Sequence, residues 1–211
     1  MLYLALLAES SQLYSCAVHA FVLMTNHVHL LVGPGVPENA SQMMKRLNER
    51  YAMHYNKRAR RTGAVWESRF KTCLVDSDVY LLRLQRYIEL NPVRAGMVSH
   101  PADYPWCSYR SHAYGETSEL LSPHSLYLSM GSTDHERPLR YRRFIASGSA
   151  EAELHAIRAA TSAEVPLASP QFLSQLPQEC QLTARPPGRP KKVPTAEERV
   201  PLYGKLGLSR F

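Results

Sequence analysis

A short turn between two apolar segments is the feature of this sequence that most restricts its fold. Residues Cys16–Met24 form a nearly continuous run of strand-forming residues, and His27–Val32 follows after the turn residues Thr25-Asn26. Gly33-Pro34-Gly35 closes the second segment. Because two strands joined by so short a turn pair antiparallel, the sequence predicts a β-hairpin.

Helical patterns lie on both sides of this hairpin. Residues 1–14 and about 41–60 have helical periodicity, and Ser41 is a suitable N-cap for the second helix. A strand is expected at Val65–Val75, and a helix is expected from Asp76 to Asn91, where Pro92 stops it. With weaker helical patterns at 119–130 and 137–160, the chain is expected to have an α+β fold with a helical C-terminal extension.

Composition indicates an ordinary globular protein with a polyanionic partner. Of 211 residues, 45% are hydrophobic and 20% are charged, and no apolar run has the length of a membrane span. The four scattered cysteines favour a reducing cytoplasm. Residues 45–71 carry nine Lys and Arg against Glu49 and Glu67. Such a cluster is typical of nucleic-acid binding, although a solvated helix face is the simpler explanation of a charge run taken alone.

Two histidines in the second strand are candidate metal ligands. His27 and His29 are separated by Val28, and residues two apart in a strand share one face with Cα atoms roughly 6.5 Å apart. Leu31 lies on the same face, and Val28, Leu30 and Val32 lie on the other. Paired imidazoles at this separation can bind one divalent cation. Two half-exposed histidines on a strand are the alternative.

Tyr87 and Asn91 are the second candidate pair. They are four residues apart in the expected helix, so the phenol and the amide lie on one face, one turn apart. Such a helix can present both groups beside a metal held by the histidine strand. Taken singly, Tyr87 also fits an aromatic residue at the edge of the core, and Asn91 fits a helix-stop residue.

Four stretches together resemble one known family. They are His19–Val32 (HAFVLMTNHVHLLV), Trp66–Asp76 (WESRFKTCLVD), Arg86–Val98 (RYIELNPVRAGMV) and Asp103–His112 (DYPWCSYRSH). The chain resembles the transposase-like proteins associated with repetitive extragenic palindromes (REP), a branch of the single-tyrosine transposases in the HUH endonuclease superfamily. The resemblance covers about residues 14–112 and keeps the order and spacing of all four stretches.

The resemblance implies a role for each candidate residue. His27 and His29 match the paired histidines, Asn91 matches the third metal ligand, and Tyr87 matches the nucleophilic tyrosine. The implied activity is nicking and rejoining of single-stranded or hairpin DNA through a 5′-phosphotyrosine intermediate, with Mg²⁺ or Mn²⁺ as the cofactor. The implied setting is the cytoplasm, at the nucleoid, without a membrane and as a monomer or a homodimer.

The resemblance also implies a ferredoxin-like antiparallel sheet with helices on one face. Members of the family have a central strand before the first helix, whereas this sequence starts within the region expected to be that helix. A late-called start codon, a truncated remnant and completion by a partner chain are the three explanations. The first is favoured because the other motif residues are intact.

Candidate DNA contacts and domain limits complete the expectations. The basic positions expected to meet DNA are Lys45, Arg46, Arg50, Arg69, Lys71, Arg94 and, in a Gly-Arg-Pro sequence typical of an AT-hook, Arg189. A disordered basic tail explains the last of these equally well. The expected domains are 1–112 for the nuclease, 113–165 for the helical extension and 166–211 for a Pro-rich basic tail, expected to be disordered.

Three functions are compatible with these patterns. The first is a DNA strand transferase that acts through Tyr87. The second is a catalytically inactive DNA-binding relative, and the third is a metal-dependent phosphoesterase in which water is the nucleophile and Tyr87 is structural.

Overall fold

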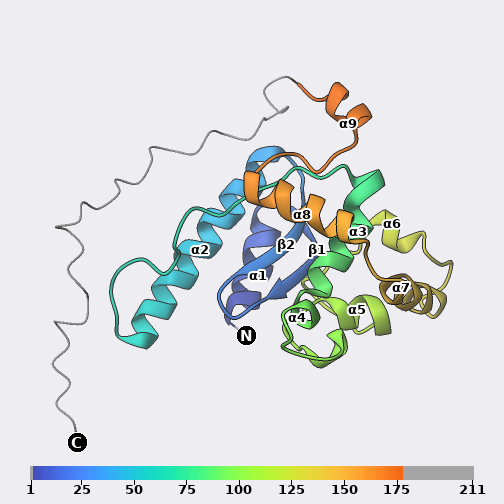
Figure 1. The fold of residues 1–211 in the computed structure, drawn as a ribbon. Coiled ribbons are helices and arrows are strands. Elements are labelled where there is room, and N and C mark those ends of the chain that lie inside the picture. Colours follow the sequence, from blue (N-terminus) through green and yellow to red (C-terminus); the bar gives the residue numbers. More distant parts are fainter. Residues whose placement is uncertain (1, 178–211) are drawn as a thin grey trace, which may run out of the picture.

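The computed structural model describes residues 2–177 (Figure 1). Helices build most of this part of the chain, around one β-hairpin. In chain order the elements are α1 (Leu2–Leu13), β1 (Cys16–Leu23), β2 (Val28–Pro34), α2 (Pro37–Ala59), α3 (Ser77–Glu89), α4 (Asn91–Arg94), the 3₁₀ helix η1 (Pro101–Asp103), α5 (Tyr109–Tyr114), α6 (Ser125–Leu128), α7 (Glu136–Ala146), α8 (Glu151–Ala163) and α9 (Pro170–Gln175). The predicted α+β fold with a helical extension is confirmed.

The predicted hairpin is present. Strands β1 and β2 pair antiparallel, with Val22 opposite His29. The backbone N–H of Met24 donates to the carbonyl of His27 at 2.8 Å, which closes the turn. Strand β2 therefore begins one residue later than the sequence suggests, and His27 lies at the end of the turn rather than within the strand.

A β-bulge at His19 changes which side chains of β1 face which core. Val18 pairs with Val32 and Ala20 pairs with Leu31, so that His19 is the extra residue. Its Nδ1 lies 2.7 Å from the carbonyl oxygen of Ser122. Because of the bulge, Val18 and Ala20 pack into different cores although they are two residues apart.

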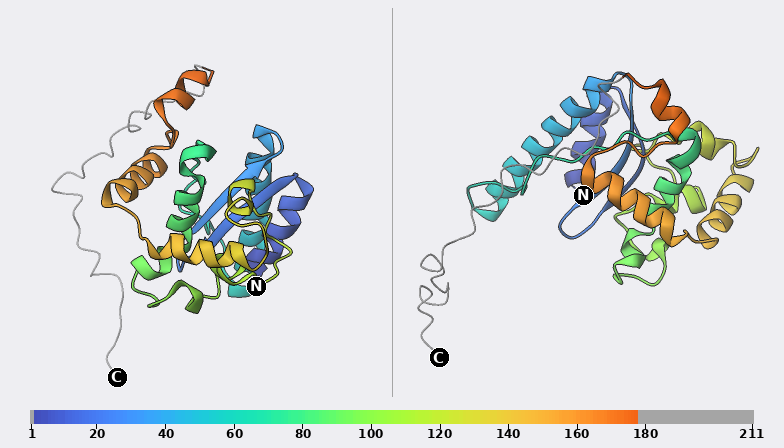
Figure 2. Two further views of the ribbon diagram at one scale, coloured as in Figure 1. Left: turned by 90° about the vertical axis from the view of Figure 1, so that its right-hand side faces the viewer. Right: turned by 45° about the horizontal axis from the view of Figure 1, so that its top comes forward.

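Helices cover both faces of the hairpin. On one face, α1 and α2 bury Leu7, Met43 and Leu47 together with Val18, as expected for helices on one face of the sheet. The opposite face is covered too, because α3, α5 and α7 pack there around a second core that includes Leu31. Figure 2 (left) shows the order of these layers: α8, α3, the hairpin and α1.

The third strand expected at Val65–Val75 does not form. The segment is irregular, and its one ladder contact is a bridge between Val75 and Leu167. The indole N–H of Trp66 donates to the carbonyl of Asn48 at 3.1 Å, which ties the segment to α2 instead. A strand needs a neighbouring edge to satisfy its backbone groups, and within residues 2–177 the hairpin is the only sheet.

Two expected helix limits are also wrong. Helix α2 begins at Pro37, with Val36 at the N-cap, so Ser41 lies inside the helix. Proline in the first turn explains this start, since its φ angle suits a helix and no N–H is lost there. Pro92 does not stop the third helix, which ends at Glu89; it lies in the first turn of the short helix α4.

The expected tail is described in part. Helix α9 lies at the start of the segment 166–211, whereas Arg189 and the Gly-Arg-Pro sequence lie outside the described residues. Among the helices of residues 2–177, none is both long and apolar enough to cross a membrane.

Candidate functional site

The two histidines lie side by side at the start of β2. The ring centroids of His27 and His29 are 4.9 Å apart and the rings meet edge to face. His27 is exposed and its Nδ1 lies 2.7 Å from the Asn26 side-chain oxygen. His29 is half-buried on the same face as Leu31, which packs in the core against α3. The predicted sharing of one face by His29 and Leu31 is confirmed.

Tyr87 projects from α3 toward this histidine pair. The ring centroids of His29 and Tyr87 are 6.0 Å apart, with the rings again edge to face. Tyr87 also packs against a small core centred on Ile157 of α8. The structure thus brings together two groups that are 58 residues apart in the sequence, as the difference between positions 87 and 29 shows.

Asn91 and Arg94 follow on α4. The backbone N–H of Arg94 bonds to the carbonyl of Leu90 and that of Ala95 to the carbonyl of Asn91, so the chain turns immediately after α3. Asn91 is half-buried, and its side chain makes no hydrogen bond within the described part of the chain. The Arg94 guanidinium folds back, lies 4.2 Å from the centroid of the Tyr87 ring and donates to the Tyr87 carbonyl.

The electrostatics of the site keep one imidazole neutral. Burial lowers the pKa of His29 to about 4, and the positive charges of His27 and Arg94 add to this effect. At neutral pH one ring nitrogen of His29 therefore carries a free lone pair, and this neutral form is the one that binds a metal.

The side chains near His27 and His29 limit which atoms could complete a metal site there. Within residues 2–177 no group of three or more His, Cys, Asp or Glu side chains could hold a metal ion. A cation bound to His27 and His29 needs its remaining ligands from an amide such as Asn91, from water or from a substrate phosphate. That mixed nitrogen and oxygen set fits Mg²⁺ or Mn²⁺ when phosphate oxygens are present.

A buried polar cluster fixes the other side of α3. The carboxylate of Glu89 is fully buried; one oxygen accepts from Ser108 at 2.6 Å and lies 2.7 Å from His112 Nδ1. The other oxygen accepts from the Tyr141 hydroxyl at 2.7 Å. Burial and the nearby Glu89 raise the pKa of Tyr141 well above its usual value, so this phenol stays protonated as a donor. Local sequence patterns did not indicate this cluster, because its partners come from two distant segments, residues 108–112 and α7.

Several expected DNA contacts are engaged within the protein. Arg46 pairs with Glu9 of α1 at 3.0 Å, and Arg50 pairs with the same carboxylate. These two ion pairs lower the pKa of Glu9. Lys71 donates to the carbonyl of Ser162 at 3.4 Å. These side chains therefore link α1 to α2 and the 65–75 segment to α8, and a DNA phosphate would compete with those contacts.

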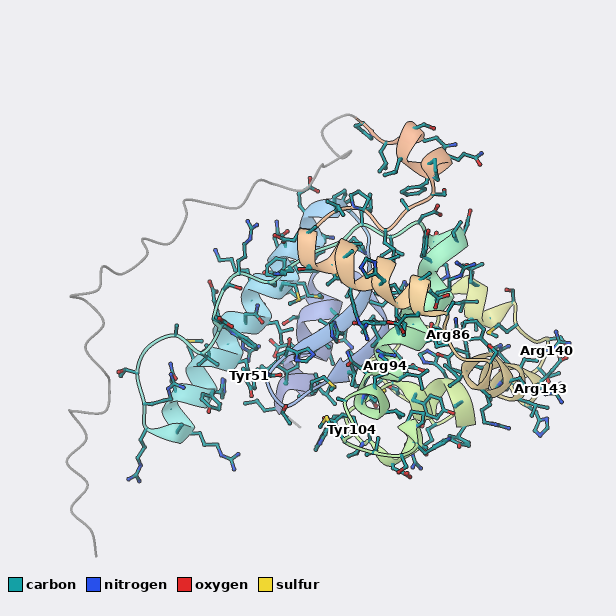
Figure 3. All side chains as sticks on the ribbon, in the orientation of Figure 1. Tyr51, Arg86, Arg94, Tyr104, Arg140 and Arg143 are labelled. Atoms are coloured by element: carbon teal, nitrogen blue, oxygen red, sulfur yellow. The ribbon has the colours of Figure 1, made fainter. Side chains whose placement is uncertain are left out.

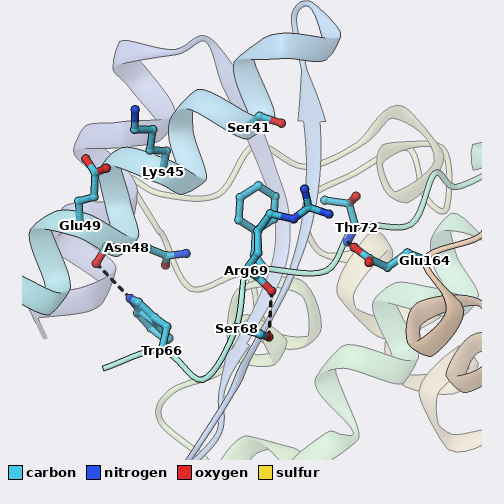
Figure 4. A pocket seen from close by; sticks show the side chains of 10 residues that line it. Ser41, Lys45, Asn48, Glu49, Trp66, Ser68, Arg69, Thr72 and Glu164 are labelled. Carbon is cyan, nitrogen blue, oxygen red and sulfur yellow. Dashed lines mark hydrogen bonds between the residues drawn. The ribbon is translucent and has the colours of Figure 1, made fainter. Parts of the chain in front are cut away.

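Lys45 and Arg69 line a cavity of about 560 Å³ between α2 and the 65–75 segment (Figure 4). Trp66 forms part of its wall, and the acidic residues Glu49 and Glu164 line it as well. Two basic and two acidic side chains give this cavity no excess of positive charge.

A comparison with known families matches the segment that contains His27, His29 and Tyr87. Residues 3–91 match the family described as Transposase IS200 like. The matched segment, which is less than half of the chain, contains the hairpin, both histidines, Tyr87 and Asn91. No curated protein and no solved structure matches the chain.

Proposed function

We propose that this protein is a REP-associated single-tyrosine transposase that nicks and rejoins single-stranded or hairpin DNA. One observation carries the proposal: His29 of β2, whose ring meets that of His27, lies beside Tyr87 of α3, with the ring centroids of His29 and Tyr87 6.0 Å apart. The match of residues 3–91 to the IS200-like transposases supports DNA as the substrate.

His27, His29 and Asn91 are the residues that would hold the cofactor. A bound Mg²⁺ or Mn²⁺ would polarise a non-bridging oxygen of the scissile phosphate and neutralise charge in the transition state. The protein's own contribution is to keep His29 neutral by burial and to hold its ring on a paired strand, with His27 at the turn that the strand follows.

Tyr87 is the proposed nucleophile. Its phenolic oxygen forms a bond to phosphorus as the bond from phosphorus to the 3′ oxygen breaks, and the phenolic proton goes to that leaving oxygen. The products are a 5′-phosphotyrosyl protein and a free 3′-hydroxyl. Rejoining is the reverse step, in which a 3′-hydroxyl displaces the tyrosine. The packing of Tyr87 against α8 and under Arg94 holds the phenol in one place.

A denaturing gel separates this function from its alternatives. A labelled single-stranded hairpin is incubated with the full chain and Mg²⁺ or Mn²⁺, and covalent protein–DNA adducts are scored. We expect an adduct that is lost in Tyr87→Phe and kept in Tyr80→Phe, a matched tyrosine on the same helix. Cleavage without any adduct would instead show a phosphoesterase that uses water, and binding without cleavage would show an inactive DNA-binding relative.

A further inference from the structure

We propose that Arg94 and Arg158 together form a binding site for a backbone phosphate of single-stranded DNA, directly beside Tyr87. The helical extension then takes part in the site, because Arg158 belongs to α8. The choice of DNA rests on the proposed function, whereas the site itself rests on the geometry of these two arginines.

Arg94 is held in place by contacts that leave its charge uncompensated. The guanidinium stacks on the Tyr87 ring, with the guanidinium carbon 4.2 Å from the ring centroid, and donates to the Tyr87 carbonyl. Figure 3 labels it close to the C-terminal end of α3, whereas Arg140 and Arg143 of α7 point outward. A guanidinium has five N–H donors, so a single carbonyl leaves donors available for a ligand.

Arg94 also differs from its neighbour Arg86 in having no acidic partner. Arg86 of α3 is buried and pairs with Glu153 of α8 at 3.0 Å. Within residues 2–177 no carboxylate lies within ion-pair distance of Arg94. A half-buried cation is costly unless an anion compensates it, which favours an external anion as the partner.

Helix α8 brings a second positive charge to the same place. Ile157 is fully buried in the small core against which Tyr87 packs, and Arg158 is the next residue. Arg158 is exposed and lies 3.5 Å from the exposed Glu151. Burial lowers the pKa of Arg94, the nearby Tyr87 opposes this, and the charge of Arg158 lowers it further. Because Arg158 follows a residue of the core that Tyr87 contacts, its positive charge adds to that of Arg94 on this side of Tyr87 and favours an anion there.

The cavity beside Trp66 is a weaker candidate for an anion. Lys45 and Arg69 line it, but Glu49 and Glu164 line it too. The Arg94–Arg158 site has the greater excess of positive charge, and it lies at the proposed nucleophile. A phosphate bound by Arg94 lies beside the Tyr87 ring, on which the Arg94 guanidinium stacks.

Salt dependence of DNA binding tests the site without any need for cleavage. Binding of a fluorescent single-stranded hairpin oligonucleotide is measured by anisotropy at several salt concentrations, with the full chain carrying Tyr87→Phe so that no covalent product forms. Each lost phosphate contact lowers the slope of log affinity against log salt by about 0.7 for a single strand. Arg83→Ala is the matched control, since Arg83 also lies over a tyrosine of α3, with a distance of 5.8 Å to the Tyr80 ring.

We expect Arg94→Ala to reduce the slope by about 0.7 and to weaken binding roughly tenfold at low salt. Arg158→Ala should give a smaller reduction in the same direction, and Arg83→Ala should give none. Arg94→Gln, which keeps a donor for the Tyr87 carbonyl, replaces Arg94→Ala if circular dichroism shows that the alanine variant is unfolded. An unchanged slope in a folded Arg94 variant overturns the proposal, and if neither folds, an unchanged slope in Arg158→Ala overturns it.

Failure of the proposed function gives a different result from failure of the phosphate site. If the gel shows no adduct while the Arg94 variant still lowers the slope, the phosphate site stands and catalysis by Tyr87 fails. If the adduct forms while the slope is unchanged, catalysis stands and the phosphate site is wrong.

Discussion

The Glu89 side and the Tyr87 side of helix α3 differ in whether their polar groups have partners within the protein. On one side, Glu89 is fully buried and both of its oxygens have partners in Ser108, His112 and Tyr141. On the other side, Tyr87 is half-buried beside a neutral imidazole and a guanidinium without a carboxylate partner among the described residues. Residues two apart on a helix point in nearly opposite directions, so one short segment carries both.

This difference indicates which polar groups serve the fold and which serve a ligand. A buried carboxylate with matched partners fixes the position of α3 against α5 and α7, and it has nothing left to offer a substrate. The Tyr87 side keeps free donors and a free lone pair, which the fold does not use. The Glu89 side of α3 therefore holds the Tyr87 side in position against β2.

The largest expected effect is on stability and comes from the Glu89 side of α3. Replacing Glu89 by alanine leaves the Tyr141 hydroxyl buried without its acceptor, and the Ser108 hydroxyl with only the carbonyl of Phe21 at 3.3 Å. We expect a loss of about 3–5 kcal/mol in the free energy of unfolding, measured by urea denaturation. A loss below about 1 kcal/mol would contradict the structural role of the cluster.

A smaller effect separates two tyrosines that differ in their surroundings. Tyr141→Phe removes one donor from Glu89, and we expect a loss of about 2–3 kcal/mol. Tyr87→Phe is the control, because the Tyr87 hydroxyl supports no described core contact; its stability should change by less than about 0.5 kcal/mol. Equal losses in the two variants would remove the distinction between the sides of α3.

The pH dependence of stability should identify His29. Its folded-state pKa is lowered to about 4 by burial, whereas an unfolded histidine titrates near pH 6.5. Between these values the unfolded chain binds the extra proton, so stability is complete above about pH 6.5 and falls as the pH drops toward 4. We expect His29→Gln to remove about 1–2 kcal/mol of this acid-induced loss.

His27→Gln provides an intermediate case for that measurement. The positive charge of His27 adds to burial in lowering the pKa of His29, so in thermal or urea unfolding His27→Gln should lose less stability than the parent protein between pH 7 and pH 4, but more than His29→Gln. Identical curves for His29→Gln and the parent protein would show that His29 is not held neutral by the fold.

Local patterns in the sequence were enough to predict the hairpin, the face shared by His29 and Leu31, and the helix that carries Tyr87. Period-two and helical spacing specify these features within a few residues. The Glu89 cluster was not predictable, because its partners lie 19, 23 and 52 residues away. Arg46 and Arg50 looked like free cations for the same reason, since Glu9 belongs to another helix.

The strand expected at residues 65–75 also failed to form for a reason that lies outside the local sequence. Residues 65–75 have an apolar pattern that suits a strand, yet they bind to α2 through Trp66 and, through Val75, to Leu167 after α8. Strand formation depends on an available edge, which the local sequence does not encode.

The most direct test of Tyr87 as the nucleophile is to find which residue becomes covalently linked to DNA. The full chain is incubated with a single-stranded hairpin and Mn²⁺, digested with protease and nuclease, and analysed by peptide mass spectrometry. We expect a 5′-phosphonucleotide on the peptide that contains Tyr87, and we expect it to be absent when His29 is replaced by glutamine. Cleaved DNA with an unmodified Tyr87 peptide, or an adduct on another residue, would contradict it.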